Sequence, residues 1–196
     1  RVLFRSVSGA TLGADRHGVA GKAYSFDGVD DFVQIEDHSS LDFNNSLTFH
    51  FWINPNSWAG AGNEGILTKK ANDSSSGYVI YRDNNYKNNI NFRYRGDGGH
   101  QNYLKTNSSV SDNQWENWTV TYEGNTSSWY KNGQLDQEYT SLPNVNNMSN
   151  SNPLRIGYAQ TWNYYFSGSI DEVRIYDRAL SAAEVAELYA LESALP

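Results

Sequence analysis

FSGSIDEVRIYDRALSAAEV, residues 166–185, is the stretch that decides the fold. Its first half carries the β-branched and aromatic residues of a strand. Ser181-Ala-Ala-Glu184 is a capping box, in which each side chain satisfies a free N–H at the start of a helix. Near the other end of the chain, residues 23–33, AYSFDGVDDFV, combine a second strand with an acidic turn. The two segments predict a sheet that is closed by the late strand and followed by one short helix.

Short β-type segments separated by turn residues fill the region between these two stretches. Residues 47–53 alternate cleanly between two faces, Pro55 ends that strand, and Asn132-Gly133 is a strong hairpin signal. No helical pattern alternates with the strands, and no linker or internal repeat divides them. We therefore predict one all-β domain, a two-sheet antiparallel jelly-roll sandwich with a short C-terminal helix. The expected strands are 24–26, 32–35, 47–53, 65–69, 77–82, 89–95, 117–123, 127–131, 154–158 and 168–176.

Composition excludes several classes of protein. The 196 residues carry a net charge of −7 and no cysteine. The negative charge argues against nucleic-acid binding, which needs a basic face, and the lack of cysteine excludes disulfides and thiolate chemistry. No apolar run approaches the ~20 residues of a membrane span, so we expect no membrane insertion. The abundance of aromatic residues, Asn, Ser and Gly indicates a secreted bacterial domain, extracellular or at the cell surface.

The two ends of the chain are expected to lie outside the domain. The first six residues, RVLFRS, can be back-translated to a sequence that resembles the end of a common sequencing adaptor, as expected of a metagenomic fragment. We therefore expect residues 1–6 to be foreign to the natural protein, residues 7–191 to form the domain, and residues 192–196 to be a tail.

The two acidic segments also carry a family resemblance. They resemble the laminin-G-like jelly-roll domains of the concanavalin A-like lectin/glucanase superfamily, in which sequences close to FDGVDDYV open the domain and GSIDEVRIYNRALS closes it. The resemblance extends from about Val7 to Leu191. It implies the jelly-roll fold, and it implies function only broadly.

The acidic residues of these segments are candidate calcium ligands, because calcium prefers six to eight oxygen ligands. The resemblance implies a structural calcium ion between the opening turn and the closing strand. The implied ligands are Asp27, the Gly28 carbonyl, Asp30 and Asp171, with Asp31 or Glu172 as further candidates. Alternatively, Asp27 caps an Asx turn and Asp171 accepts backbone N–H bonds, with no ion.

The sequence offers little for catalysis. Hydrolysis of a glycosidic bond needs two carboxylates that flank the sugar, and related glucanases carry Glu-x-Asp-x-Glu on one strand. This chain has no such triplet. A polysaccharide lyase could use His50, Arg93, Arg95 and Tyr103, but such residues are common on any β-sheet surface. We expect no enzymatic activity.

Sugar recognition uses aromatic rings against the sugar and fixed polar groups for its hydroxyls. Arg93 and Arg95 should point outward because Phe92 and Tyr94 take the core side. With Arg82 and His50 they could form a basic stripe on the concave sheet, which suits an anionic polysaccharide. Alternatively, the arginines pair with nearby acids. The aromatic and histidine candidates in the loops are Trp58, His100, Tyr103, Trp162 and Tyr164.

The sequence thus favours a non-catalytic, secreted carbohydrate-binding module that is part of a larger multidomain protein. Its expected partner is a polysaccharide or other glycan. The alternatives are an adhesion or protein-binding module, or a spacer, of a large extracellular protein.

Overall fold

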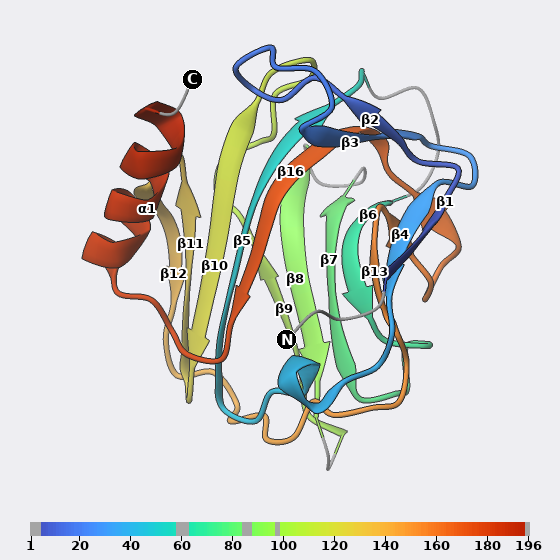
Figure 1. Cartoon of the computed structure of the whole chain (residues 1–196). Helices are drawn as coiled ribbons and strands as arrows, with labels where there is room; N and C mark the ends of the chain where they lie inside the picture. The colour runs from blue at the N-terminus through green and yellow to red at the C-terminus, as the bar shows by residue number, and fades with distance from the viewer. Residues whose placement is uncertain (1–4, 58–62, 84–87, 97–98, 195–196) are drawn as a thin grey trace.

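The computed structural model describes residues 5–57, 63–83, 88–96 and 99–194. Two seven-stranded antiparallel sheets pack face to face, and one helix lies outside them (Figure 1). This is the jelly-roll sandwich that the sequence predicts.

The strands divide between the sheets as follows. Sheet A has the order β1 (Arg5–Ser8), β4 (Phe32–Ile35), β13 (Leu154–Ile156), β6 (Glu64–Lys69), β7 (Gly77–Asp83), β8 (Asn89–Arg95) and β9 (Gln101–Lys105). Sheet B has the order β12 (Gln134–Tyr139), β11 (Thr126–Lys131), β10 (Glu116–Glu123), β5 (Ser46–Pro55), β16 (Ser167–Tyr176), β3 (Ala23–Asp27) and β2 (Thr11–Gly13). A short hairpin, β14 (Tyr158–Ala159) and β15 (Tyr164–Tyr165), and a 3-10 turn, η1 (Ser39–Leu41), complete the β part.

The core lies between the inner faces of the two sheets. The apolar face of β5 supplies Phe49 and Phe51, both fully buried, as the alternation predicts. Phe49 packs edge-on against Phe92 of sheet A, with ring centroids 5.7 Å apart. Contacts of this kind fix which side chains of each strand point into the sandwich.

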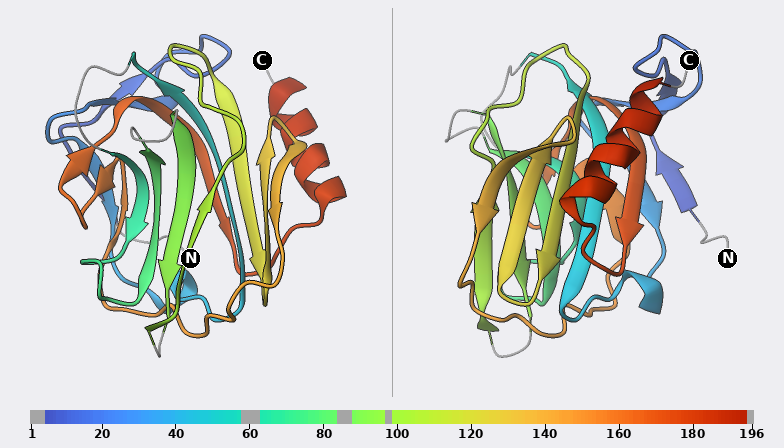
Figure 2. Two further views of the ribbon diagram at one scale, coloured as in Figure 1. Left: turned by 180° about the vertical axis from the view of Figure 1, so that it is seen from behind. Right: turned by 90° about the vertical axis from the view of Figure 1, so that its left-hand side faces the viewer.

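The helix α1 (Ala182–Ala194) covers the outer face of sheet B (Figure 2). The predicted capping box is confirmed, because the Ser181 N–H donates to Glu184 at 2.8 Å and the Glu184 N–H donates to the Ser181 hydroxyl at 3.3 Å. The predicted domain was too short at both ends, because Arg5 and Ser6 already belong to β1 and pair with β4, and residues 192–194 are not a tail. The helix continues to Ala194, and the Glu192 side chain is fully buried against the sheet.

The β14–β15 hairpin covers part of the outer face of sheet A. Gly65 of β6 makes this packing feasible, because a Cβ there would lie 1.9 Å from the backbone nitrogen of Ala159. The hairpin is thereby pressed onto the sheet, with Trp162 in its turn.

The two acidic segments meet only in part. β3 pairs with β16, with Asp27 opposite Ser167, whereas β4 belongs to the other sheet. The turn at Gly28–Asp31 therefore crosses from one sheet to the other. A β-bulge interrupts the pairing of β16 with β5 between Asp171 and Arg174, where Glu172 adopts a φ of +48°.

Candidate functional site

A cation–aromatic cluster lies on the outer face of sheet A. Arg93 points outward from the middle of β8, between Val79 and Tyr103 in the cross-strand register. Its guanidinium carbon lies 4.5 Å from the centroid of the Tyr103 ring and 5.6 Å from that of Trp162. Arg93 also forms an ion pair with Asp73. The arginine therefore holds two aromatic side chains from separate segments in one place.

The aromatic rings are the solvent-facing part of this cluster. Tyr103 is 51 % exposed and Trp162 is half-buried, whereas Arg93 is only 6 % exposed. Trp162 also packs edge-on against Tyr81, with ring centroids 4.8 Å apart. We call Tyr81, Arg93, Tyr103 and Trp162 the aromatic platform. The platform offers a preformed surface on which a flat, partly apolar ligand can stack.

Basic side chains surround the platform. Arg95 is half-buried beside Gln101, and His100 is exposed at the β8–β9 turn. Lys70 is buried and donates to the Ser75 carbonyl. Burial, with repulsion from Arg93 and Arg95, lowers the pKa of Lys70 to about 8. The platform is therefore a locally positive region of an acidic protein.

The structure brings together most of the predicted ligand residues. Five of them lie on or beside the outer face of sheet A: Arg93, Arg95, His100, Tyr103 and Trp162. Tyr164 is 37 % exposed in the hairpin that also carries Trp162. The residue Trp58 lies outside the described residues.

The prediction for His50 was wrong. His50 lies on β5 in sheet B, and α1 covers it. Its Nε2 lies 2.9 Å from Glu192 Oε2, and its Nδ1 lies 2.8 Å from the Thr119 hydroxyl. His50 does lie on the outward face of its strand, as predicted, but that strand belongs to sheet B and not to the sheet that carries Arg93. The same finding separates His50 from Arg93, Arg95 and Tyr103, with which it was considered as a lyase site.

The prediction for Arg82 was also wrong. Arg82 lies in step with Tyr78 and Ile80, so its side chain turns to the inner side of sheet A and is fully buried. It forms ion pairs with Glu64, at 3.1 Å, and with Asp112. These contacts join the end of β7 to neighbouring segments and leave Arg82 no place in the platform.

The Glu64–Arg82 pair leads to a pH prediction. Burial raises the pKa of Glu64 to about 7, although Arg82 opposes the rise. The pKa of a glutamate in the unfolded chain is about 4.3. Between about pH 4.3 and 7, Glu64 is therefore protonated only in the folded state. The free energy of unfolding should therefore fall as pH rises through this window, by about 4 kcal/mol from this group. Urea unfolding at pH 5 and pH 7.5 should show a smaller fall for Glu64→Gln, and equal falls would contradict the assignment.

Three carboxylates gather at the turn between β3 and β4. Oxygen atoms of Asp27, Asp30 and Asp31 all lie within 4.8 Å of one another. Asp27 also caps the turn, since its Oδ1 accepts the Val29 N–H at 2.8 Å. Burial, with repulsion from Asp27 and Asp30, raises the pKa of Asp31. Among the described residues no cationic side chain pairs with these three, and the oxygen set fits a calcium ion.

Asp171 does not belong to this cluster, so its prediction as a fourth ligand was wrong. In the antiparallel register Asp27 lies opposite Ser167, and Asp171 follows four residues later, about 13 Å along the strand. The bulge at Glu172 also reverses the alternation, so Asp171 shares the outer face with its partner Trp52. There it forms an ion pair with Arg16 at 3.1 Å.

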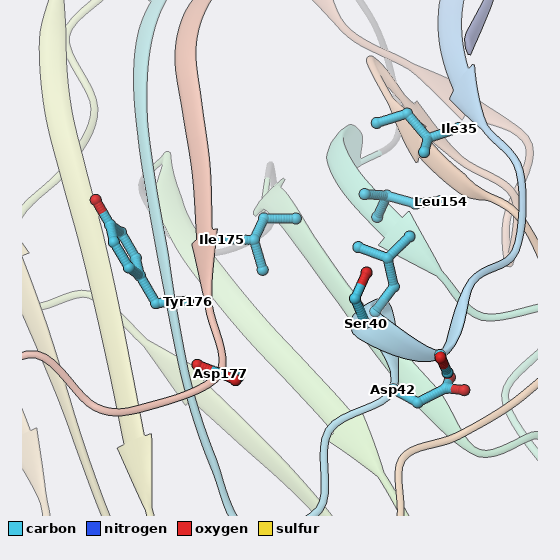
Figure 3. Close-up of a pocket in the computed structure, with 9 residues that line it drawn as sticks. Ile35, Ser40, Asp42, Leu154, Ile175, Tyr176 and Asp177 are labelled. Carbon is cyan, nitrogen blue, oxygen red and sulfur yellow. The ribbon is translucent and has the colours of Figure 1, made fainter. Parts of the chain in front are cut away.

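A cavity of about 550 Å³ opens between the sheets near η1 and the end of β16. Ile35, Leu154 and Ile175 converge on it (Figure 3). Asp42 at its rim is bound to Lys69 at 2.8 Å, which occupies that carboxylate. Of the predicted ligand residues that the structure describes, none lines this cavity.

Comparison with protein families identifies the class. The family model described as "Concanavalin A-like lectin/glucanases superfamily" matches residues 27–186. The chain belongs to this superfamily, as the opening and closing motifs predict. Among curated protein sequences, none matches the chain significantly. In the described part of the chain, no helix is both long and apolar enough to cross a membrane.

Solved structures show the same fold at low sequence identity. The binding domain of botulinum neurotoxin serotype G has a TM-score of 0.77 and 17 % identity, and the match covers 98 % of this chain and 47 % of that one. The serotype D ligand-binding domain in complex with N-acetylneuraminic acid has a TM-score of 0.72 and 16 % identity, and covers 97 % and 46 %. Domain 4 of AbnA, an extracellular arabinanase from Geobacillus stearothermophilus in complex with arabinotriose, has a TM-score of 0.70 and 18 % identity, and covers 94 % and 87 %. The chain spans about half of the toxin domains and most of the arabinanase domain.

Proposed function

We propose that the protein is a non-catalytic carbohydrate-binding module and that its ligand stacks on the aromatic platform of sheet A. The observation that carries this proposal is the arrangement of Tyr103 and Trp162 around Arg93. Because a buried cation already holds the two rings in place, they need little reorganisation when a ligand binds, which lowers the entropic cost of binding. The complexes of the arabinanase domain and the toxin domain with sugars support the proposal.

The surroundings of the platform favour an anionic polysaccharide. Arg95 and His100 lie at its rim, while Lys70 lies buried beside it. Arginine binds a carboxylate or sulfate through two parallel hydrogen bonds. We propose that the module is secreted and works as one part of a larger extracellular protein, as the toxin and arabinanase domains are parts of larger proteins.

A glycan array tests this function. We expect the protein to bind a restricted set of polysaccharides, with anionic ones over-represented, and to leave every bound glycan uncleaved. The array should be followed by chromatography of the glycans after incubation. Absence of any bound glycan would overturn the proposal, and cleaved products would replace it with an enzymatic function.

We also propose that Asp27, Asp30 and Asp31 bind a structural calcium ion, with the Gly28 carbonyl as a further ligand. The ion would neutralise adjacent carboxylates and fasten the turn that joins the sheets. Calcium at one hundred times its Kd should stabilise the fold by about 3 kcal/mol, and EDTA should reverse the effect.

Thermal unfolding with and without calcium checks the calcium proposal. Asp30→Asn should lose the calcium-dependent rise in Tm, whereas Asp177→Asn, at the opposite end of β16, should keep it. A Tm that is independent of calcium in the unmodified protein would contradict it.

Protein binding is the second candidate function. Leu12 and Val29 are 62 % and 69 % exposed, and such apolar side chains suit a protein partner. Loss of a protein partner on Leu12→Asp, with glycan binding retained, would favour this alternative.

A further inference from the structure

Arg155 occupies a second position on the outer face of sheet A. It is the central residue of β13, and it points outward because Leu154 and Ile156 on either side pack into the core. The register aligns Arg155 with Thr68, Thr68 with Val79, and Val79 with Arg93. Three strand spacings therefore separate the two arginines, which is about 14 Å.

The Arg155 guanidinium is held on one edge and on one side, where the Phe32 and Tyr158 rings lie next to each other with centroids 5.7 Å apart. Its Nε donates to Gln34 Oε1 at 2.9 Å, and the Gln34 amide donates in turn to Glu36 at 3.0 Å. The guanidinium carbon lies 5.8 Å from the Phe32 ring centroid and 5.9 Å from that of Tyr158. These contacts fix the orientation of the fork before any ligand arrives.

The other edge of the guanidinium is free. Within the described residues, the two terminal nitrogens of Arg155 have no hydrogen-bond partner and no carboxylate at ion-pair distance. Arg93, by contrast, is paired with Asp73, and Arg174 is paired with Glu172. The half-buried Arg155 therefore keeps a free fork in a protein whose net charge is −7.

The hairpin that carries Trp162 also supplies the aromatic surface beside Arg155. Tyr158 stacks on Tyr165, with ring centroids 4.4 Å apart and planes inclined by 19°. The same element thus places Trp162 over Arg93 and Tyr158 beside Arg155. The outer face of sheet A consequently carries two cation–aromatic clusters on one support.

We propose that Arg155 binds the carboxylate of an acidic sugar residue and forms a second subsite on the face that carries the aromatic platform. Its two terminal nitrogens match the two oxygens of a carboxylate, and Tyr158 offers a ring beside the sugar. The subsite rests on the proposed carbohydrate-binding function and specifies which group of the ligand is recognised. Because the subsites are about 14 Å apart, an oligosaccharide is needed to occupy both.

Paired oligosaccharides test this subsite. The probes are oligogalacturonates, oligoglucuronates and oligomannuronates of several lengths, each beside its carboxyl-reduced neutral counterpart, titrated by calorimetry. For at least one pair, the carboxylated form should bind about ten- to one-hundredfold more tightly. Arg155→Ala should remove this preference, and Arg155→Lys should restore only part of it, because lysine keeps the charge without the fork.

Two further variants separate local recognition from net charge. Glu36→Gln removes the acid bound to Gln34 and should increase the preference for the carboxylated form. Arg178→Ala removes one positive charge on the far side of the sandwich, where Arg178 pairs with Glu184, and should leave the preference unchanged.

The possible outcomes are distinct. If neutral oligosaccharides bind but no carboxylated form is preferred, the Arg155 subsite is overturned and the proposed function stands. A preference that survives Arg155→Ala overturns the subsite equally. If neither member of any pair binds, the subsite is overturned, and the glycan array alone decides the proposed function.

Discussion

Replacement of Trp162 by alanine is expected to weaken glycan binding by about ten- to one-hundredfold, because buried tryptophan anchors contribute about 2 kcal/mol or more to binding. Trp162 contacts both Tyr81 and Arg93, and the same guanidinium contacts the ring of the exposed Tyr103. Alanine would remove one side of the platform and leave the sheet below intact. Calorimetric titration with the best glycan from the array would measure the change.

Trp115 provides a matched control. It is also half-buried, but it lies next to β10 in sheet B. Trp115→Ala should leave the affinity within about twofold of the original, because it contributes nothing to the platform. Equal losses of affinity in the two variants would show that the effect of Trp162 is not local.

Replacement of Glu192 by alanine is expected to lower the free energy of unfolding by about 3–5 kcal/mol, since it removes one partner of a buried charged network. The Glu192 carboxylate accepts hydrogen bonds from Trp52 Nε1, at 2.6 Å, and from Arg174 Nε, at 2.8 Å. His50 Nε2 lies 2.9 Å from the same carboxylate. Alanine removes the acceptor of the buried Trp52 and His50 side chains and of the exposed Arg174, and it loosens the end of α1. Urea unfolding would measure the loss.

The control for this change lies on the same helix. Glu187 is exposed, and Glu187→Ala should change the free energy of unfolding by less than about 0.5 kcal/mol. Burial alone would raise the pKa of Glu192, but hydrogen bonds and charge from His50, together with Trp52 and Arg174, hold it below its usual value.

The pH dependence follows from the lowered pKa. The stabilisation is present above the unfolded value of about 4.3 and is lost as pH falls through the folded value. The difference in the free energy of unfolding between Glu192→Ala and the unmodified protein should therefore become smaller below about pH 4. An equally large effect of Glu187→Ala would contradict the role of the buried network.

Much of the fold follows from local pattern. The alternation in β5 places Phe49 and Phe51 in the core, and the Asn132-Gly133 hairpin has the positive φ angles, 50° and 74°, that its turn requires. Each expected strand has a counterpart in the structure. β9 was missed because its five residues lie in a stretch rich in Gly, Asn and Ser, and β9 carries Tyr103.

The site was predicted less completely, for identifiable reasons. Periodicity indicates which face of a strand is outward, but it does not indicate to which sheet the strand belongs, so His50 was grouped with Arg93. Asp171 was misplaced because a bulge at a non-glycine residue has no clear sequence signal. The wrong prediction for Arg82 was avoidable, because side chains alternate along a strand and Arg82 therefore lies on the same, core-facing side as Tyr78. The outward position of Arg155 was likewise readable from its Leu-Arg-Ile context.

The central claim is that a glycan binds on the outer face of sheet A. The indole N–H signals of the tryptophans in a ¹H–¹⁵N spectrum test it directly during titration with the best glycan from the array. The Trp162 signal should shift progressively to saturation. Trp52, beneath α1, and Trp118, in the core, should keep their signals unchanged. A saturated complex in which the Trp162 signal has not moved would contradict the account.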